Sequence, residues 1–210
     1  MSEQAGSTTP CDEGRVAWGP PPLHDRHVTQ LATDDLHAGL DNVRCSPKDD
    51  GFVALIVRRP AEDKREVLEE AHLDRTDGLV GDTWNVRISK RTGEGPDPEC
   101  QITLMNARAA ALVAGTSDHG GLAGDQVYVD FDLGGDNIPP GTRLQLGTAV
   151  LEVSAKPHTG CAKFAARFGK DALRFVNSDV GRELNLRGIN TKVVVAGTVR
   201  TGDAVRKLPA

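Results

Sequence analysis

Short apolar runs separated by turns rich in glycine, proline and aspartate recur along most of this chain. The dense apolar run at 52–57 ends at Arg58-Arg59-Pro60, which is typical of a buried strand. The segment 65–73 has the composition of a helix, but a strand over 66–73 fits its spacing equally well. Further strands are predicted at 101–105, 126–130, 143–146, 149–153, 193–199 and 204–207. Short strands at regular spacing predict a mainly β fold, a small closed barrel with a few peripheral helices.

Helical periodicity appears in fewer places. Residues 28–43 carry leucines spaced for one helix face, namely Leu31, Leu36 and Leu40. Asn106 can cap a helix that runs to about Val113, and Gly115 can end it. The segment 162–168 reads as a helix with Phe164, Ala165 and Phe168 on one face and Lys163 and Arg167 on another, and 172–177 as a further helical turn.

These patterns divide the chain into three parts. Residues 1–22 are rich in Ser, Thr, Gly and Pro and predict a flexible arm. Residues 23–51 predict a helical N-terminal extension, and residues 52–210 predict the barrel domain.

Composition limits the classes of function. A formal charge of −5 gives no basic footprint for nucleic acid. No apolar run approaches the roughly 20 residues needed to span a bilayer, and the polar N-terminus lacks the pattern of a signal peptide. We therefore expect a cytoplasmic protein without nucleic-acid or membrane partners. The four cysteines form no Cys-x-x-Cys pair, which argues against structural zinc and predicts four free thiols.

The strongest candidate for chemistry is Cys161, which follows a predicted strand and opens a predicted helix. Unpaired N–H groups at the helix start and the cations Lys163 and Arg167 would favour a thiolate there. A thiolate can carry sulfur, attack an electrophile or bind a soft metal. His158 could protonate or orient this thiol, or be a surface histidine in a turn. The alternative for Cys161 is an inert buried thiol.

An ordered set of segments resembles the MOSC domain, the family named for the C-terminal part of molybdenum cofactor sulfurases. The segments are GLVGD at 78–82, QITL at 101–104, AGDQVYVD at 123–130, PPGTRLQLG at 139–147, AVLEV at 149–153, the single Cys161, and AGTVRTGDAV at 196–205. The resemblance covers about residues 52–207 and implies a β-barrel fold. It also implies that Cys161 either accepts and carries sulfur or binds molybdenum in a pterin cofactor.

The resemblance gives the charged residues a candidate ligand. Lys156, Lys163, Arg167 and Arg187, together with Lys90 or Arg91, could hold the phosphate of the pterin cofactor, or could simply form a solvated surface. Asp82 and Asp125 lie in Gly-Asp turns, where an aspartate typically bonds its own backbone. The chain lacks the pyridoxal-phosphate domain of the sulfurases, so pyridoxal phosphate is not expected as its cofactor.

Two classes of function remain open at this point. The first is an enzyme, either a sulfur transferase or a molybdopterin-dependent oxidoreductase that acts on N-hydroxylated compounds, with a sulfur donor or an electron-transfer protein as partner. The second is a module that binds or delivers a cofactor or another anionic small molecule without turnover. The sequence specifies neither the substrate nor the oligomeric state.

Overall fold

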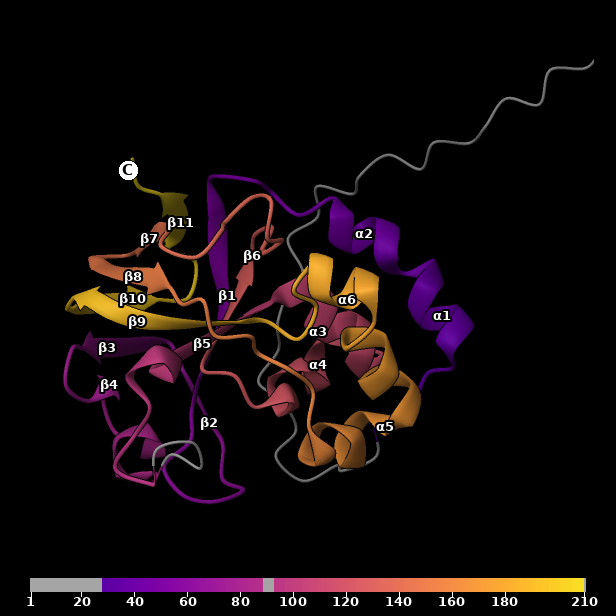
Figure 1. Ribbon diagram of the computed structural model, residues 1–210, viewed down its shortest axis with the longest axis horizontal. Coiled ribbons are helices and arrows are strands. Elements are labelled where there is room, and N and C mark those ends of the chain that lie inside the picture. The colour runs from indigo at the N-terminus through magenta and orange to yellow at the C-terminus, as the bar shows by residue number, and fades with distance from the viewer. Residues whose placement is uncertain (1–27, 89–92, 210) are drawn as a thin grey trace, which may run out of the picture.

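The computed structural model describes residues 28–88 and 93–209, and within these residues seven strands close into a mixed barrel (Figure 1). The strand order is β11-β7-β8-β9-β5-β6-β1, and pairing of β1 with β11 closes the barrel. Strands β5 and β6 run parallel, and the other neighbours run antiparallel. The barrel strands are β1 (Gly51–Arg58), β5 (Ile102–Asn106), β6 (Val127–Asp130), β7 (Arg143–Leu146), β8 (Ala149–Val153), β9 (Ile189–Val195) and β11 (Ala204–Lys207). The predicted fold class is confirmed.

The remaining strands flank the barrel. β2 (Glu66–Leu68) pairs with β1, and β10 (Gly197–Arg200), β3 (Glu70–Asp74) and β4 (Gly78–Leu79) form a small sheet. The ambiguous segment after residue 65 is therefore extended and not helical, but it forms two strands, β2 and β3, in place of the single strand expected over 66–73. The strand predicted at 193–199 is divided between β9 and β10. At Gly197 a side chain would meet the backbone of Thr148 at 2.5 Å, so only glycine allows the close approach at this crossing.

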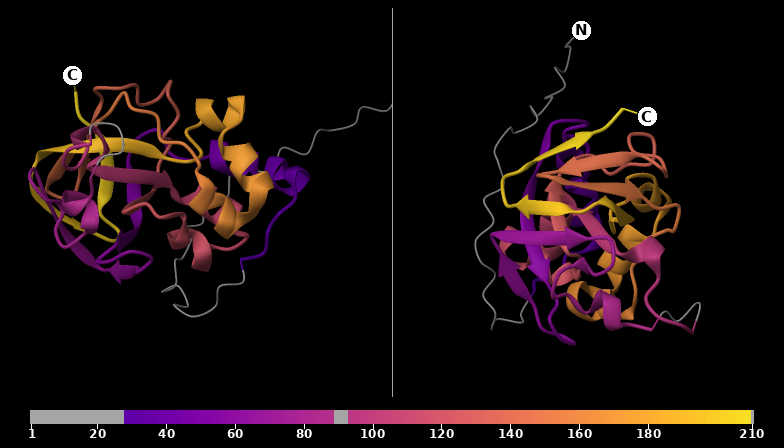
Figure 2. Two further views of the ribbon diagram at one scale, coloured as in Figure 1. Left: turned by 60° about the horizontal axis from the view of Figure 1, so that its bottom comes forward. Right: turned by 90° about the vertical axis from the view of Figure 1, so that its left-hand side faces the viewer.

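The α-helices gather on one side of the barrel, which Figures 1 and 2 show from different directions. The α-helices are α1 (Thr33–Ala38), α2 (Leu40–Arg44), α3 (Ala107–Ala114), α4 (Ser117–Gly120), α5 (Ala162–Val176) and α6 (Asp179–Glu183). The short 3-10 helices are η1 (Thr83–Val86), η2 (Pro98–Cys100) and η3 (Gly121–Ala123). The apolar faces of α1, α2, α3 and α5 form a second core outside the barrel, in which Leu36 and Leu40 are buried with Phe164 and Phe168.

Helix ends follow the local signals closely. Asn106 caps α3 by accepting a hydrogen bond from the Ala109 N–H, and Gly115 ends the helix with φ 71°, as predicted. The single helix predicted at 28–43 is instead two short helices, α1 and α2, which meet at Gly39. A side chain at Gly39 would lie 2.3 Å from Leu112 Cδ1, so this glycine allows α3 to pack closely at the break.

Helix α5 joins the two helical pieces predicted at 162–168 and 172–177. Its geometry is interrupted at Gly169, where φ is 90° and ψ is 169°. The predicted arm at 1–22 lies outside the described residues, and the boundary at 51/52 stays a prediction. Among the helices at 28–88 and 93–209, none has both the length and the apolar character needed to cross a membrane.

Candidate functional site

A pocket of about 390 Å³ opens beside the start of α5, and we call it the cationic pocket. Its wall comes from the ends of β1 and β8, from η1, η2 and β5, and from β9. The lining residues are Arg59, Trp84, Arg87, Ile88, Pro96, Asp97, Cys100, Thr103, Lys156, Pro157, His158, Thr159 and Asn190. A larger hollow of about 590 Å³ lies between residues 30–32 and α5, but its only titratable side chains are Lys170 and Asp171. The chemistry is therefore concentrated in the cationic pocket.

Cys161 is a free, exposed thiol at the residue that immediately precedes α5. The pocket-lining residue Thr159 lies two positions earlier, so the two Cα atoms are at most about 7 Å apart. Cys161 does not itself line the pocket, and its side chain does not cap the helix. The alternative that this cysteine fills the core is wrong, because the residue is open to solvent.

The two cations expected to face Cys161 are held by acids of the β1–β2 loop. Lys163 Nζ lies 3.0 Å from Glu62 Oε1 and 3.7 Å from Asp63 Oδ1. The hydrogen bond that Lys163 donates to Glu62 raises the pKa of Lys163. Arg167 donates to the Leu122 carbonyl at 2.9 Å and lies 3.6 Å from Asp63. Both side chains therefore connect α5 to neighbouring loops.

His158 and Arg187 meet at Asp125, which is fully buried. Arg187 Nη1 lies 2.6 Å from Asp125 Oδ2, and His158 Nδ1 lies 3.4 Å from Asp125 Oδ1. Burial, followed by the positive charge of Arg187, lowers the pKa of His158 to about 4. The imidazole is therefore neutral near pH 7, and its two ring nitrogens can donate one hydrogen bond and accept another without a charge on the ring. The carboxylate of Asp125 binds Arg187 and not its own backbone, contrary to the expectation for a turn aspartate.

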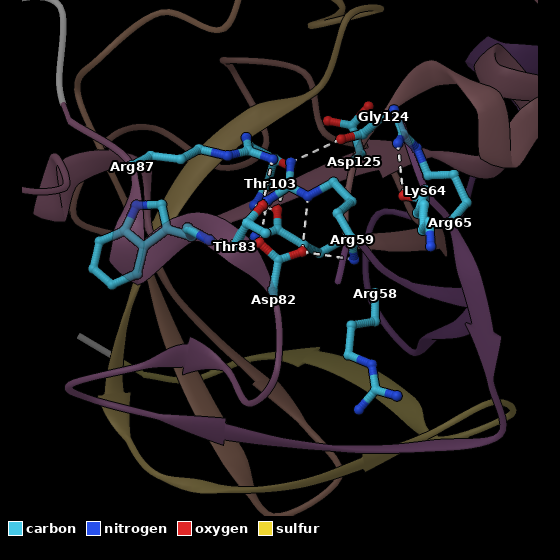
Figure 3. Close-up of polar contacts among 12 residues, drawn as sticks. Arg58, Arg59, Lys64, Arg65, Asp82, Thr83, Arg87, Thr103, Gly124 and Asp125 are labelled. Atoms are coloured by element: carbon cyan, nitrogen blue, oxygen red, sulfur yellow. Dashed lines mark hydrogen bonds and ion pairs between the residues drawn. The ribbon is translucent and has the colours of Figure 1, made fainter. Parts of the chain in front are cut away.

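A second ion pair fixes Arg59 in the wall of the pocket. Arg59 and Asp82 form a bidentate contact, with Nε–Oδ2 and Nη2–Oδ1 distances of 2.8 Å each (Figure 3). Asp82 also accepts the N–H of Trp84 and caps η1, which agrees with the structural role expected for it. Arg87 donates to the hydroxyl of Thr83, and partial burial together with the charge of Arg59 lowers its pKa.

Lys156 lies next to the thiol of Cys100, for which the sequence predicted no role. Its Nζ lies 2.6 Å from Asp97 Oδ2 and also hydrogen-bonds the thiol of Cys100, which is half-buried and free. Burial raises the pKa of Cys100, and Lys156 opposes that rise. The pocket thus has one thiol in its wall and a second, Cys161, beside it.

The remaining predictions concern Lys90, Arg91, the number of free thiols and a possible metal site. Lys90 and Arg91 lie outside the described residues. Cys45 is disulfide-bonded, so the expectation of four free thiols is wrong. Within residues 28–88 and 93–209, no group of three or more His, Cys, Asp or Glu side chains could hold a metal ion. A metal at Cys161 would therefore need most of its ligands from a cofactor.

The chain is thus a closed mixed β-barrel protein with an exposed thiol at the connection between β8 and α5. The sequence model of the MOSC domain matches residues 97–206, which is just over half of the chain. The chain therefore belongs to the MOSC domain family.

Solved structures support the same fold. The YUAD protein from Bacillus subtilis is similar over 74% of this chain and 93% of its own, with 17% identity and a TM-score of 0.52. YiiM from Escherichia coli is similar over 76% of this chain and 70% of its own, with 18% identity and a TM-score of 0.50. No curated protein sequence gives a significant match.

Proposed function

We propose that this MOSC protein handles sulfur or a molybdenum cofactor in the cytoplasm, with Cys161 as the reacting thiolate. One observation carries the proposal, namely an exposed free thiol two residues beyond the wall of a cation-lined pocket. An exposed thiol can receive an atom from a partner protein, whereas a pocket beside it can hold a small anion.

The residues of the pocket fit an anionic pterin cofactor. Arg59, Arg87 and Lys156 bring positive charge, and Thr103 and Asn190 bring neutral polar groups. Arg87 makes no ion pair among the described residues, so its guanidinium is available for a phosphate. Cys161 would supply the soft sulfur ligand that molybdenum accepts. When bound, such a cofactor would supply a metal centre that exchanges electrons with the substrate.

The chain's own groups have defined tasks in either version of the function. In a sulfur carrier, the Cys161 thiolate attacks the outer sulfur of a donor persulfide, a new S–S bond forms, and the donor leaves as its thiolate. In a redox enzyme for N-hydroxylated compounds, Cys161 holds the cofactor. In that version neutral His158, kept uncharged by burial and Arg187, orients the substrate by hydrogen bonding at the pocket wall. An electron-transfer protein would be the partner in the redox version.

The decisive experiment compares the wild-type chain with Cys161→Ser, both produced in a host that makes the cofactor. A redox enzyme should contain molybdenum and a fluorescent pterin that Cys161→Ser loses. A carrier should contain neither, but should gain the mass of one sulfur atom at Cys161 after exposure to a persulfide donor. Cys100→Ser is the matched control, because that thiol lies in the pocket wall. Absence of metal, pterin and persulfide from the wild type would reject both versions.

A second candidate is a binding or delivery module without turnover. It is favoured by the fact that Cys161 does not line the pocket, whereas three cations do. For such a module, Cys161→Ser should keep its affinity for the anionic ligand, and Arg87→Met should lose it. The reverse pattern would favour the thiolate versions.

A further inference from the structure

Three successive backbone carbonyls in the Gly124 loop, residues 121–125, each accept a hydrogen bond from a different arginine. Leu122 O accepts from Arg167, Ala123 O from Arg187, and Gly124 O from Arg59. The arginines come from α5, from the segment before β9 and from the end of β1. The loop is therefore held in one conformation by guanidinium groups that are far apart in sequence.

A fourth arginine, Arg65, approaches the same loop and is poorly paired. Figure 3 shows its side chain beside Gly124. Its Nη1 donates to the Lys64 carbonyl, and its Nε is buried without any hydrogen-bond partner. No carboxylate within residues 28–88 and 93–209 lies at ion-pair distance from it. Burial, and then the like charge of Arg167, lowers the pKa of Arg65. An anion beside the guanidinium of Arg65 would supply the counter-charge that it lacks and would separate the two like charges.

The guanidinium groups of Arg65 and Arg167 converge over Gly124. This residue has φ 99°, and a Cβ placed on it would lie 3.4 Å from Arg167 Nη1 and 3.6 Å from Arg65 Nη2. Apart from the glycine and its chain neighbours, no other atom lies within 4 Å of that point. The two nitrogens are therefore at most about 7 Å apart, a span that one tetrahedral oxyanion can bridge with a hydrogen bond of about 2.9 Å to each guanidinium group.

We propose that Arg65 and Arg167 form, over Gly124, a subsite for a tetrahedral oxyanion such as phosphate or a phosphate monoester. Asp63 competes with this anion for Arg167. Guanidinium groups match such anions because they donate two parallel hydrogen bonds. Asp63 Oδ1 lies 3.6 Å from Arg167 and is largely exposed, so an anion of higher charge can replace it as the partner of Arg167.

This subsite is separate from the thiol chemistry. Arg65, Gly124 and Arg167 do not line the cationic pocket, and the inference needs no reaction at Cys161. Cys161→Ser should therefore leave oxyanion binding unchanged even if the proposed function is wrong.

The test is isothermal titration of the full chain with inorganic phosphate and with phenyl phosphate, at constant ionic strength because screening weakens such contacts. Arg65→Met and Arg167→Met should each weaken binding about tenfold or more, as expected for loss of a charge-assisted contact. Arg65→Met removes a buried donor that has no partner, so this variant should remain folded. Arg174→Met is the matched control, since Arg174 is an exposed arginine of the same helix.

Asp63→Asn tests whether the carboxylate of Asp63 competes with the anion for Arg167. If the carboxylate competes for Arg167, this variant should bind phosphate several times more tightly than the wild type, which loss of a merely structural contact would not cause. Tighter binding of phenyl phosphate than of phosphate would identify the ligand as an organic phosphate, and equal binding would identify the free oxyanion. The proposal is overturned if neither anion binds, or if Arg65→Met binds as well as Arg174→Met does.

Discussion

Asp125 and Arg187 form an ion pair whose carboxylate is completely shielded from solvent and whose guanidinium is only 8% exposed. The pair joins the Gly124 loop to the segment before β9, and Arg187 also lies 5.1 Å over the ring of Phe164 in α5. One contact thus connects the barrel with the helix that follows Cys161.

We expect Asp125→Asn to lower the free energy of unfolding by about 3–5 kcal/mol, because it leaves the buried Arg187 without a counter-charge. Denaturant unfolding followed by circular dichroism measures this change. Asp179→Asn is the control, since Asp179 pairs with Arg182 on the exposed surface of α6 and should have no measurable effect. Equal effects of the two substitutions would contradict the importance given to the buried pair.

His158 should make stability depend on pH. Its pKa is about 4 in the folded chain and about 6.5 when exposed, so the unfolded chain binds the proton more readily between these values. Stability is therefore fully present above pH 6.5 and is lost as the pH falls toward 4, at up to about 1.4 kcal/mol per pH unit and about 3 kcal/mol in total.

The measurement is the free energy of unfolding between pH 4 and 7 for the wild type and His158→Gln. The variant should lack this part of the pH dependence, while His72→Gln, at an exposed position on β3, should retain it. Parallel curves for the wild type and His158→Gln would show that His158 is not held neutral by its surroundings.

The sequence predicted the barrel because its signals are local. Alternating residues mark β7, and a helix cap at Asn106 can be read from adjacent positions. The break at Gly39 could not be predicted, because its cause is the approach of Leu112 from another helix. Fold class therefore followed from pattern, whereas helix continuity depended on tertiary contacts.

The candidate site was predictable only in part, for the same reason. Cys161, His158 and Lys156 lie in one short segment, and the sequence marked all three. The contact between Lys156 and Cys100 joins positions 56 residues apart, and no spacing rule connects them. Arg65 was missed because an orphaned nitrogen is visible only when its surroundings are known.

The two free thiols of the described residues, Cys100 and Cys161, should differ in reactivity. Cys161 is exposed, whereas Cys100 is half-buried and has a raised pKa. We expect iodoacetamide at pH 8 to modify Cys161 well before Cys100, as measured by mass spectrometry of the digested peptides. In Cys161→Ser, the fast modification should disappear, and only the slow modification of Cys100 should remain. Modification of Cys100 at the rate of Cys161 would show that the pocket wall opens readily.

Lys156 should set the acidity of Cys100, because its ammonium group hydrogen-bonds the thiol and opposes the rise in pKa caused by burial. Lys156→Met removes this charge while retaining the apolar stem, so the pKa of Cys100 should rise further. The rate of Cys100 alkylation, measured against pH in the Cys161→Ser background, should then reach its midpoint at higher pH than in the parent. Lys170→Met, on the exposed surface of α5, is the control and should leave the midpoint in place. The contrary outcome is a midpoint that stays unchanged in Lys156→Met or moves to lower pH. Either result would mean that Lys156 interacts only with Asp97 and that burial alone sets the pKa of Cys100.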